Sequence, residues 1–261
     1  MSRNPAVIRF VVTLFEPFRL AHRMRFEGLE KIPEQRPVLL VANHSIGAVL
    51  EVFGILSAWE KRFGDRPAYG LAHRLAFRIP GIASVMRALG AVPADYGVAK
   101  RLLDSGAALL VFPGGNWEAT RRFTHGNEVD FDGHRGWISV AKASGVDVVP
   151  VAISGSYRVN PVLGRSEWLA KLTGFRALLA VHWLPITIGQ IVWTLLYLVF
   201  VAGALPWPLA FLGAILVFAF TPLFPIWPAR ITVRFGDPMA SDGDPEALDR
   251  DVRALIAARL D

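Results

Sequence analysis

With 261 residues, the chain is long enough to bury a sizeable core in one domain or two. Its composition is both apolar and basic, with 53% hydrophobic and 19% charged residues, a mean hydropathy of +0.39 and a formal net charge of +6. This combination favours an anionic membrane surface as partner, and nucleic acid is not expected because no basic run is interleaved with aromatic residues. The lack of cysteine excludes disulfides, thiolate zinc sites and a cysteine nucleophile.

Residues 1–28 are predicted to form an amphipathic helix in a membrane interface. The helical pattern runs from residue 5 to residue 26, and Pro17 is expected to kink or split it. A polar stripe follows spacings of three, four and seven: Arg9, Thr13, Glu16 and Arg23. The wide apolar face opposite this stripe suits the lipid interface, and a helix docked on the protein core is the alternative of equal weight. Charges within the apolar stretch argue against a signal peptide.

From residue 37 onward, short apolar strands alternate with helical segments. Strands are expected at 37–42, 67–72, 107–112, 146–153 and 230–235. Helices are expected at 46–59, 75–89 with a break near residue 80, 136–144 and 245–260. This alternation predicts an α/β fold with a mostly parallel sheet flanked by helices, whose active site lies at the carboxyl ends of the strands.

Residues 183–229 depart from this plan, because they contain no Asp, Glu, Lys or Arg. A membrane span needs ~20 apolar residues, so the segment could hold two, with Pro206 near the turn. Charges resume at Arg176 and Arg230, which places both ends on one side, expected to be the cytoplasmic face of the inner membrane. We therefore expect a membrane-embedded hydrophobic hairpin, spanning or re-entrant, inserted into an α/β domain of residues 29–261. A buried helical layer of a soluble domain is the alternative.

Asn43, His44 and Ser45 follow directly on the first buried strand, which places the histidine at a strand's carboxyl end. An imidazole titrates near neutrality, so it can take a proton from an alcohol and return it to a leaving group. A lone histidine is more often structural than catalytic, so His44 needs support from a second element.

That element is the run from Phe112 to Glu118, at the end of another buried strand. The paired glycines after Pro113 leave backbone N–H groups bare, so an oxyanion, a carbonyl or a phosphate can approach closely. Glu118 is expected to orient His44 or to contact an acceptor hydroxyl, and the arginines at 121 and 122 can meet phosphate groups of a lipid or of coenzyme A. A plain Pro-Gly-Gly turn is the alternative.

Together with Val149-Pro150-Val151, these elements resemble the glycerolipid acyltransferase superfamily, which includes the lysophosphatidic-acid acyltransferases. The Pro-Gly-Gly-x-x-Glu form is more similar to the diacylglycerol-acyltransferase branch. The resemblance covers about residues 30–160 and 230–238. It implies transfer of a fatty acyl group from acyl-CoA or acyl-ACP to a hydroxyl of a glycerolipid or lysophospholipid, with neither a metal nor a cofactor nor a covalent enzyme intermediate.

The sequence departs from the family pattern at two positions. Val49 stands where the family's usual acid follows the histidine, and the nearest acid is Glu51. A continuous helix would separate Glu51 from His44 by ~10 Å, but Gly47 allows a later helix start that brings them closer. The second departure is Gly114, which replaces a glutamate of the lysophosphatidate enzymes, and Arg135 is a candidate to compensate.

The candidate catalytic residues are His44, Glu51 and Glu118, and the candidate substrate-binding residues are Asn43, Ser45, Gly47, Pro113, Gly114, Gly115, Arg121 and Arg135. Two other functions remain open. A lipid or thioester hydrolase would need a nucleophile, and no Gly-x-Ser-x-Gly elbow is present. A non-catalytic lipid-binding member of the same fold is favoured by Val49.

Overall fold

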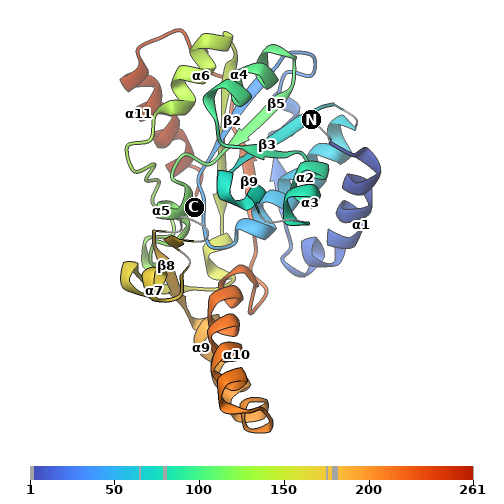
Figure 1. Cartoon of the computed structure of the whole chain (residues 1–261). Helices are drawn as coiled ribbons and strands as arrows, with labels where there is room; N and C mark the ends of the chain where they lie inside the picture. The colour runs from blue at the N-terminus through green and yellow to red at the C-terminus, as the bar shows by residue number, and fades with distance from the viewer. Residues whose placement is uncertain (1–2, 65, 79–80, 175, 178–181, 261) are drawn as a thin grey trace.

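The structure is a computed structural model that describes residues 3–64, 66–78, 81–174, 176–177 and 182–260. Seven strands form its central sheet: β1 Arg25–Glu27, β2 Val38–Ala42, β3 Ala68–Ala72, β4 Ala91–Pro93, β5 Ala108–Val111, β6 Asp147–Ser154 and β9 Thr232–Phe235. Their order is β1-β9-β6-β2-β5-β3-β4 (Figure 1), and every neighbouring pair is parallel except β6 and β9. The prediction of a mostly parallel α/β sheet is therefore confirmed.

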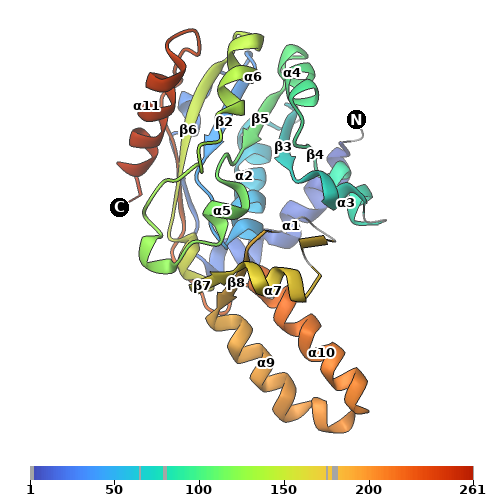
Figure 2. The ribbon, with the colours of Figure 1, turned by 60° about the vertical axis from the view of Figure 1, so that its left-hand side comes forward.

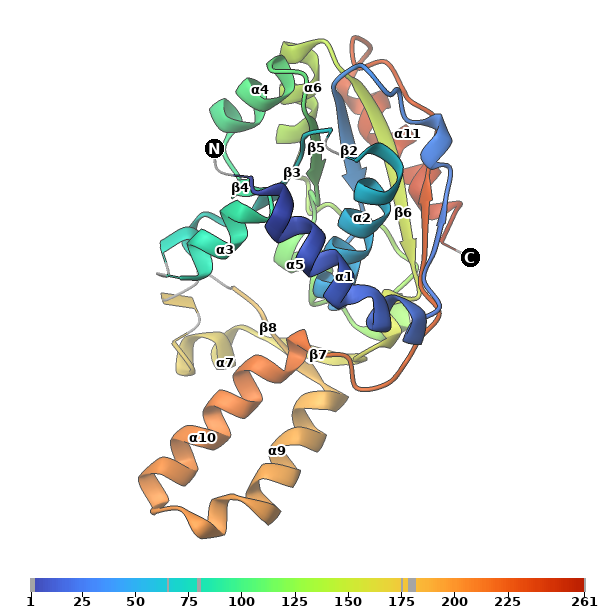
Figure 3. The same ribbon diagram turned by 90° about the vertical axis from the view of Figure 1, so that its right-hand side faces the viewer.

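Helices cover both faces of this sheet (Figures 2 and 3). One face carries α4 Tyr96–Asp104, α6 Gly136–Ser144 and α11 Pro245–Ala257, and the other carries α1 Pro5–Ala21, α2 Ala48–Phe63 and α3 Ile82–Ala88. Side chains alternate along β2, so that Leu39 packs in the core of the first face and Leu40 in the core of the second. Burial on both faces explains why β2 is apolar at every position.

The N-terminal helix is shorter than predicted. It ends at Ala21, and residues 25–27, which we predicted as helix, form β1 beside β9. The chain leaves the helix at Arg23, whose φ of 46° is left-handed, and pairing with the last strand then fixes the extended conformation. Pro17 lies within one continuous helix.

Two opposite faces of α1 are apolar. Ile8, Val12 and Phe15 are buried, so this stripe docks on the protein core. Phe10 and Leu14 lie on another face and are 68% and 63% exposed. The helix therefore packs on the core and still presents an apolar surface outward.

The segment predicted as a hairpin contains two helices, α9 Ile188–Phe200 and α10 Trp207–Phe220, which lie side by side and project away from the sheet (Figure 2). They follow a small antiparallel sheet of β7 Val162–Ser166 and β8 Leu184–Thr187, with α7 Glu167–Leu172 between its strands. None of the helices in the described ranges is long and apolar enough to cross a bilayer. Apolar side chains are exposed along the whole hairpin, so it is not a buried layer of the domain.

Candidate active site

The candidate site lies at the carboxyl ends of β2, β5 and β6, which are neighbours in the centre of the sheet. His44 follows β2, Glu118 follows β5, and Ser156 follows β6. Parallel strands bring these three loops to the same edge of the sheet, where open α/β sheets place their ligands.

His44 and Glu51 are in contact. The imidazole Nδ1 lies 2.7 Å from Glu51 Oε2, and the ring stacks on Phe112 at 4.4 Å between centroids. This contact is possible because α2 begins only at Ala48, so residues 43–47 form a turn that places Glu51 in the first helical turn, directly behind the histidine. The bond to Nδ1 leaves Nε2 as the ring nitrogen available to a substrate.

A hydroxyl pair completes the surroundings of Glu51, whose side chain is fully buried. Ser45 Oγ donates to Glu51 Oε1 at 2.5 Å and lies 2.9 Å from Ser156 Oγ. Gly47 packs against Ser156, since a Cβ at position 47 would lie 2.9 Å from the Ser156 carbonyl oxygen. The position of Ser156 beside Ser45 and Glu51 has no signal in the sequence.

Glu118 reaches the histidine from the other side. It lies in the short helix α5 Gly115–Ala119, and its Oε2 accepts a hydrogen bond from the backbone N–H of His44 at 2.9 Å. Its Oε1 accepts from Arg121 at 3.2 Å and from the Asp130 N–H at 3.3 Å. Burial raises the pKa of Glu118 to about 7, against the opposing effects of Arg121 and His44.

Asn43 joins two strands. Its Nδ2 donates to the Ile153 carbonyl at 2.9 Å, and its Oδ1 accepts from the Ile153 N–H at 2.7 Å. Both polar ends of this buried amide are thus used by β6, so the residue fixes the end of β2, directly before His44.

The Pro113-Gly114-Gly115 loop is less open than the sequence suggested. The Gly115 N–H donates to the Phe112 carbonyl at 3.1 Å, so it is already used and is not free for an oxyanion. A Cβ at Gly114 would lie 2.5 Å from the Glu118 Cβ, and the lack of a side chain there allows the glutamate to pack closely. The glycine at 114 therefore makes room for Glu118.

The structure separates the two candidate arginines. Arg121 pairs with Glu118 at the edge of the site, whereas Arg135 pairs with Glu246 at 3.2 Å and Asp249 at 3.7 Å on α11. These partners tie Arg135 to the helix layer on one face of the sheet, away from the cluster around His44.

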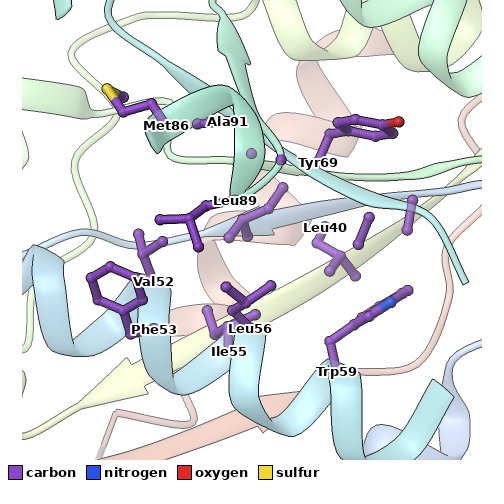
Figure 4. Close-up of a pocket in the computed structure, with 15 residues that line it drawn as sticks. Leu40, Val52, Phe53, Ile55, Leu56, Trp59, Tyr69, Met86, Leu89 and Ala91 are labelled. Atoms are coloured by element: carbon purple, nitrogen blue, oxygen red, sulfur yellow. The ribbon is translucent and has the colours of Figure 1, made fainter. Parts of the chain in front are cut away.

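An apolar cavity of about 210 Å³ lies between α2 and the sheet (Figure 4). On α2 it is lined by Val52, which follows Glu51 directly, and by Phe53, Ile55, Leu56 and Trp59. The sheet, α3 and the turn after α3 supply the remaining lining residues: Leu40, Ala68, Tyr69, Gly70, Met86, Leu89, Gly90, Ala91, Ala108 and Leu110. Sequence reasoning missed this cavity, because its walls come from segments that only the fold brings together.

The family model described as Acyltransferase matches residues 23–154, about half of the chain and the part that carries His44, Glu51 and Glu118. The chain belongs to the Acyltransferase family. An uncharacterized protein of Mycobacterium tuberculosis is 31% identical to this chain over 174 residues, 66% of this chain and 48% of that protein. A Bos taurus protein described as a DGAT1/2-independent enzyme synthesizing storage lipids is 28% identical over 130 residues, 50% of this chain and 38% of that one.

The crystal structure of the 1-acyl-sn-glycerophosphate (LPA) acyltransferase PlsC from Thermotoga maritima has a similar fold. Its TM-score is 0.55 at 21% identity, over 97% of this chain and 80% of that one. The family match, together with this shared fold, confirms the resemblance to the glycerolipid acyltransferase superfamily. The chain spans about half the length of the curated relatives it matches.

The geometry of the site permits acid–base chemistry at a single imidazole. Glu51 holds the ring through Nδ1 and can stabilise a positive charge on it, which leaves Nε2 free to exchange a proton with a substrate. The Ser45 hydroxyl is directed at Glu51 rather than at the imidazole, so it is not placed as a nucleophile activated by His44.

Proposed function

We propose that this acyltransferase moves a fatty acyl group from an acyl thioester to a hydroxyl of a glycerolipid or lysophospholipid. The observation that carries the proposal is the His44–Glu51 contact at a strand end of an Acyltransferase-family domain. His44 Nε2 removes the proton of the lipid hydroxyl, and the hydroxyl oxygen attacks the carbonyl carbon of the thioester. The C–S bond then breaks, and the imidazolium returns the proton to the thiolate. No covalent enzyme intermediate is required.

The two glutamates have different roles in this mechanism. Glu51 touches the imidazole itself, so it orients the ring and stabilises the imidazolium. Glu118 touches only the backbone of His44 and is a positioning residue that holds the turn after β2. Asn43 acts in the same way through β6.

The apolar cavity beside α2 is suited to an acyl chain. It has room for an apolar ligand, and it starts one residue beyond Glu51, so a chain lying in it would present its carbonyl carbon near His44. The donor carrier is coenzyme A or acyl carrier protein.

We also propose that the α9–α10 hairpin dips into the lipid bilayer, at the cytoplasmic face of the inner membrane. α10 is apolar on every side, and exposed apolar residues on both helices include Leu196, Phe200 and Leu209. At a rise of ~1.5 Å per residue each helix is ~20 Å long, so the hairpin could enter the hydrocarbon from one side. The outward apolar face of α1 could lie in the interface of the same membrane.

The test is a product analysis with purified protein in lipid vesicles. An acyl thioester is supplied with and without a lipid alcohol, and free thiol, fatty acid and ester are measured. The proposal predicts ester in amounts equal to the thiol released, and little thiol without acceptor. Equal thiol release without acceptor, with free fatty acid as product, would favour a hydrolase, and lipid binding without turnover would favour a non-catalytic role.

A further inference from the structure

A second hollow, with a volume of about 630 Å³, is lined by residues of α5, of the loop after it and of the small β7–β8 sheet. Its lining contains several charged side chains, whereas that of the first cavity contains none. It includes the arginines at 121, 122 and 165 together with the indoles of Trp117 and Trp183. Neither the family resemblance nor the sequence analysis identified Arg165 as a functional residue.

Arg165 is held in a fixed position. Its guanidinium carbon lies 3.5 Å from the ring centroid of Trp117 and 4.9 Å from that of Trp183. Its Nη1 donates to the Trp117 carbonyl oxygen at 2.9 Å. The centroids of the two indoles are 6.0 Å apart, so the rings bound the guanidinium on two adjacent sides, and the bond to the Trp117 carbonyl uses one of its five N–H donors.

Two carboxylates, Glu128 and Asp130, also line the hollow, and each already has a partner there. Asp130 accepts from Trp117 Nε1 at 2.7 Å and from the Asp132 N–H at 2.9 Å, and Glu128 pairs with His125 at 2.7 Å. Arg121 is taken by Glu118.

Arg122 and Arg165 differ from Arg121 in this respect, because no carboxylate of the described residues lies within 4.0 Å of either guanidinium. Burial lowers the pKa of Arg165, and the charges of Asp130 and Asp132 oppose this effect. The hollow therefore contains a partly buried, pre-oriented cation with unused donors.

We infer that this hollow binds a phosphate group of one of the substrates, with Arg165 as a two-pronged ligand and Arg122 as a second cation. The planar guanidinium fork matches the geometry of phosphate oxygens, and the indoles prevent it from folding away. The inference rests on the proposed function. A phosphate group is common to the coenzyme A part of the donor and to the headgroup of a phosphate-bearing acceptor.

The position of the hollow supports this assignment. Trp117, which stacks on Arg165, precedes Glu118 in α5, and Glu118 bonds the backbone of His44. A phosphate at Arg165 would therefore lie one short helix away from the reacting atoms. The apolar cavity is lined from α2, the helix that carries Glu51, so the two hollows could take the charged and the apolar parts of the substrates.

The experiment measures equilibrium binding, so that it does not depend on turnover. Coenzyme A is compared with phosphate-free pantetheine, and lysophosphatidate with monoacylglycerol in the same micelles. Each probe is titrated alone into the wild-type protein and into Arg165→Gln, Arg165→Lys and Arg122→Gln. Arg62→Gln is the matched control, because Arg62 also lies over an aromatic ring, at 5.1 Å from that of Phe63, but at the far end of α2.

We expect one phosphate-bearing probe to lose about 10- to 100-fold in affinity in Arg165→Gln, with a smaller loss in Arg122→Gln. Arg165→Lys should recover only part of the lost affinity, and the affinities for pantetheine and monoacylglycerol should not change in any of the variants. The pair that responds identifies donor or acceptor as the source. The inference would be overturned if Arg122→Gln and folded Arg165→Gln both bound the two phosphate-bearing probes as the wild-type protein does. If Arg165→Gln does not fold, the binding measured for Arg122→Gln decides alone. A wild-type protein that binds the phosphate but forms no ester would instead refute the proposed function.

Discussion

At the residue scale, the acid that orients the histidine lies at an unusual distance along the chain. The helix-based separation of ~10 Å would have excluded Glu51, yet the observed distance to His44 is 2.7 Å. The turn at residues 45–47 accounts for the difference, since α2 starts at Ala48 and Ser156 leaves room only for a glycine at position 47. The sequence identified both partners but could not fix their contact, because the contact depends on the loop after β6.

We predict that Glu51→Gln lowers kcat by ~10²-fold or more, because the amide neither holds the imidazole in the same way nor stabilises the imidazolium. The measurement is ester formation at saturating substrates. Glu30→Gln, at an exposed position, is the matched control and should keep wild-type turnover. Wild-type kcat in a folded Glu51→Gln protein would remove Glu51 from the mechanism.

Glu118 gives a pH-dependent prediction for stability. Its pKa rises from 4.5 to about 7 on folding. Between pH 4.5 and pH 7 the folded state therefore keeps a proton on Glu118 that the unfolded state has lost. The free energy of unfolding should therefore fall by ~3 kcal/mol as the pH rises from about 4.5 to 7, and this contribution should stay constant above pH 7.

Urea unfolding of the wild-type protein and of Glu118→Gln at pH 5 and pH 8 measures this contribution. From pH 5 to pH 8, the free energy of unfolding should fall more for the wild-type protein than for the variant. Equal losses would show that burial of this carboxyl is not the source of the pH dependence.

At the scale of elements, the strands of the sheet centre were predictable because each is a continuous apolar run. The edge strands β1 and β4 were not, since each has three residues and is fixed by its neighbour rather than by its own pattern. The helix α4 was also missed. Asp95 caps it by accepting from the Val98 N–H, a signal that could have revealed it.

The hairpin gives a prediction for membrane binding. Phe200 and Leu209 are 75% and 54% exposed, so Phe200→Asp with Leu209→Asp should leave the protein folded. A charge at bilayer depth costs ~3 kcal/mol, so binding to vesicles of phosphatidylethanolamine and phosphatidylglycerol should fall at least 100-fold. Co-sedimentation measures it, with Tyr96→Asp on α4 as the control. Unaltered vesicle binding of the double variant would argue that the hairpin docks elsewhere, for example on a second copy of the chain.

At the scale of the whole molecule, the proposed substrate sites are made by parts far apart in sequence. The apolar cavity joins α2, α3 and four strands, and the second hollow joins α5 to the small sheet from which the hairpin extends. Sequence patterns report on single segments, so they indicated the His44 and Glu118 loops and gave no sign of either cavity. The fold is needed to show that one is lined from the helix that carries Glu51 and the other from the helix that carries Glu118.

The cavity predicts the preferred chain length. Gly70 lines it from β3, and a Cβ there would meet no atom within 4 Å, so Gly70→Leu should fill the space without strain. We expect the variant to prefer shorter acyl thioesters, with kcat/KM for long chains reduced ~10-fold or more. Rates with a series of donor chain lengths provide the measurement. Gly136→Leu, at an exposed position with the same open space, is the control, and an unchanged chain-length profile in Gly70→Leu would place the acyl chain elsewhere.

The most direct test of the whole account is the rate of ester formation by His44→Ala, measured under single-turnover conditions with a saturating lipid alcohol. Binding of both substrates and the unfolding transition should stay close to those of the wild-type protein. The imidazole of His44 is partly exposed, and its neighbours Ser45 and Glu51 remain hydrogen-bonded to each other without it. The account predicts a rate lower by ~10²- to 10⁴-fold, the contribution of a general base. Ester formation at the wild-type rate would contradict it.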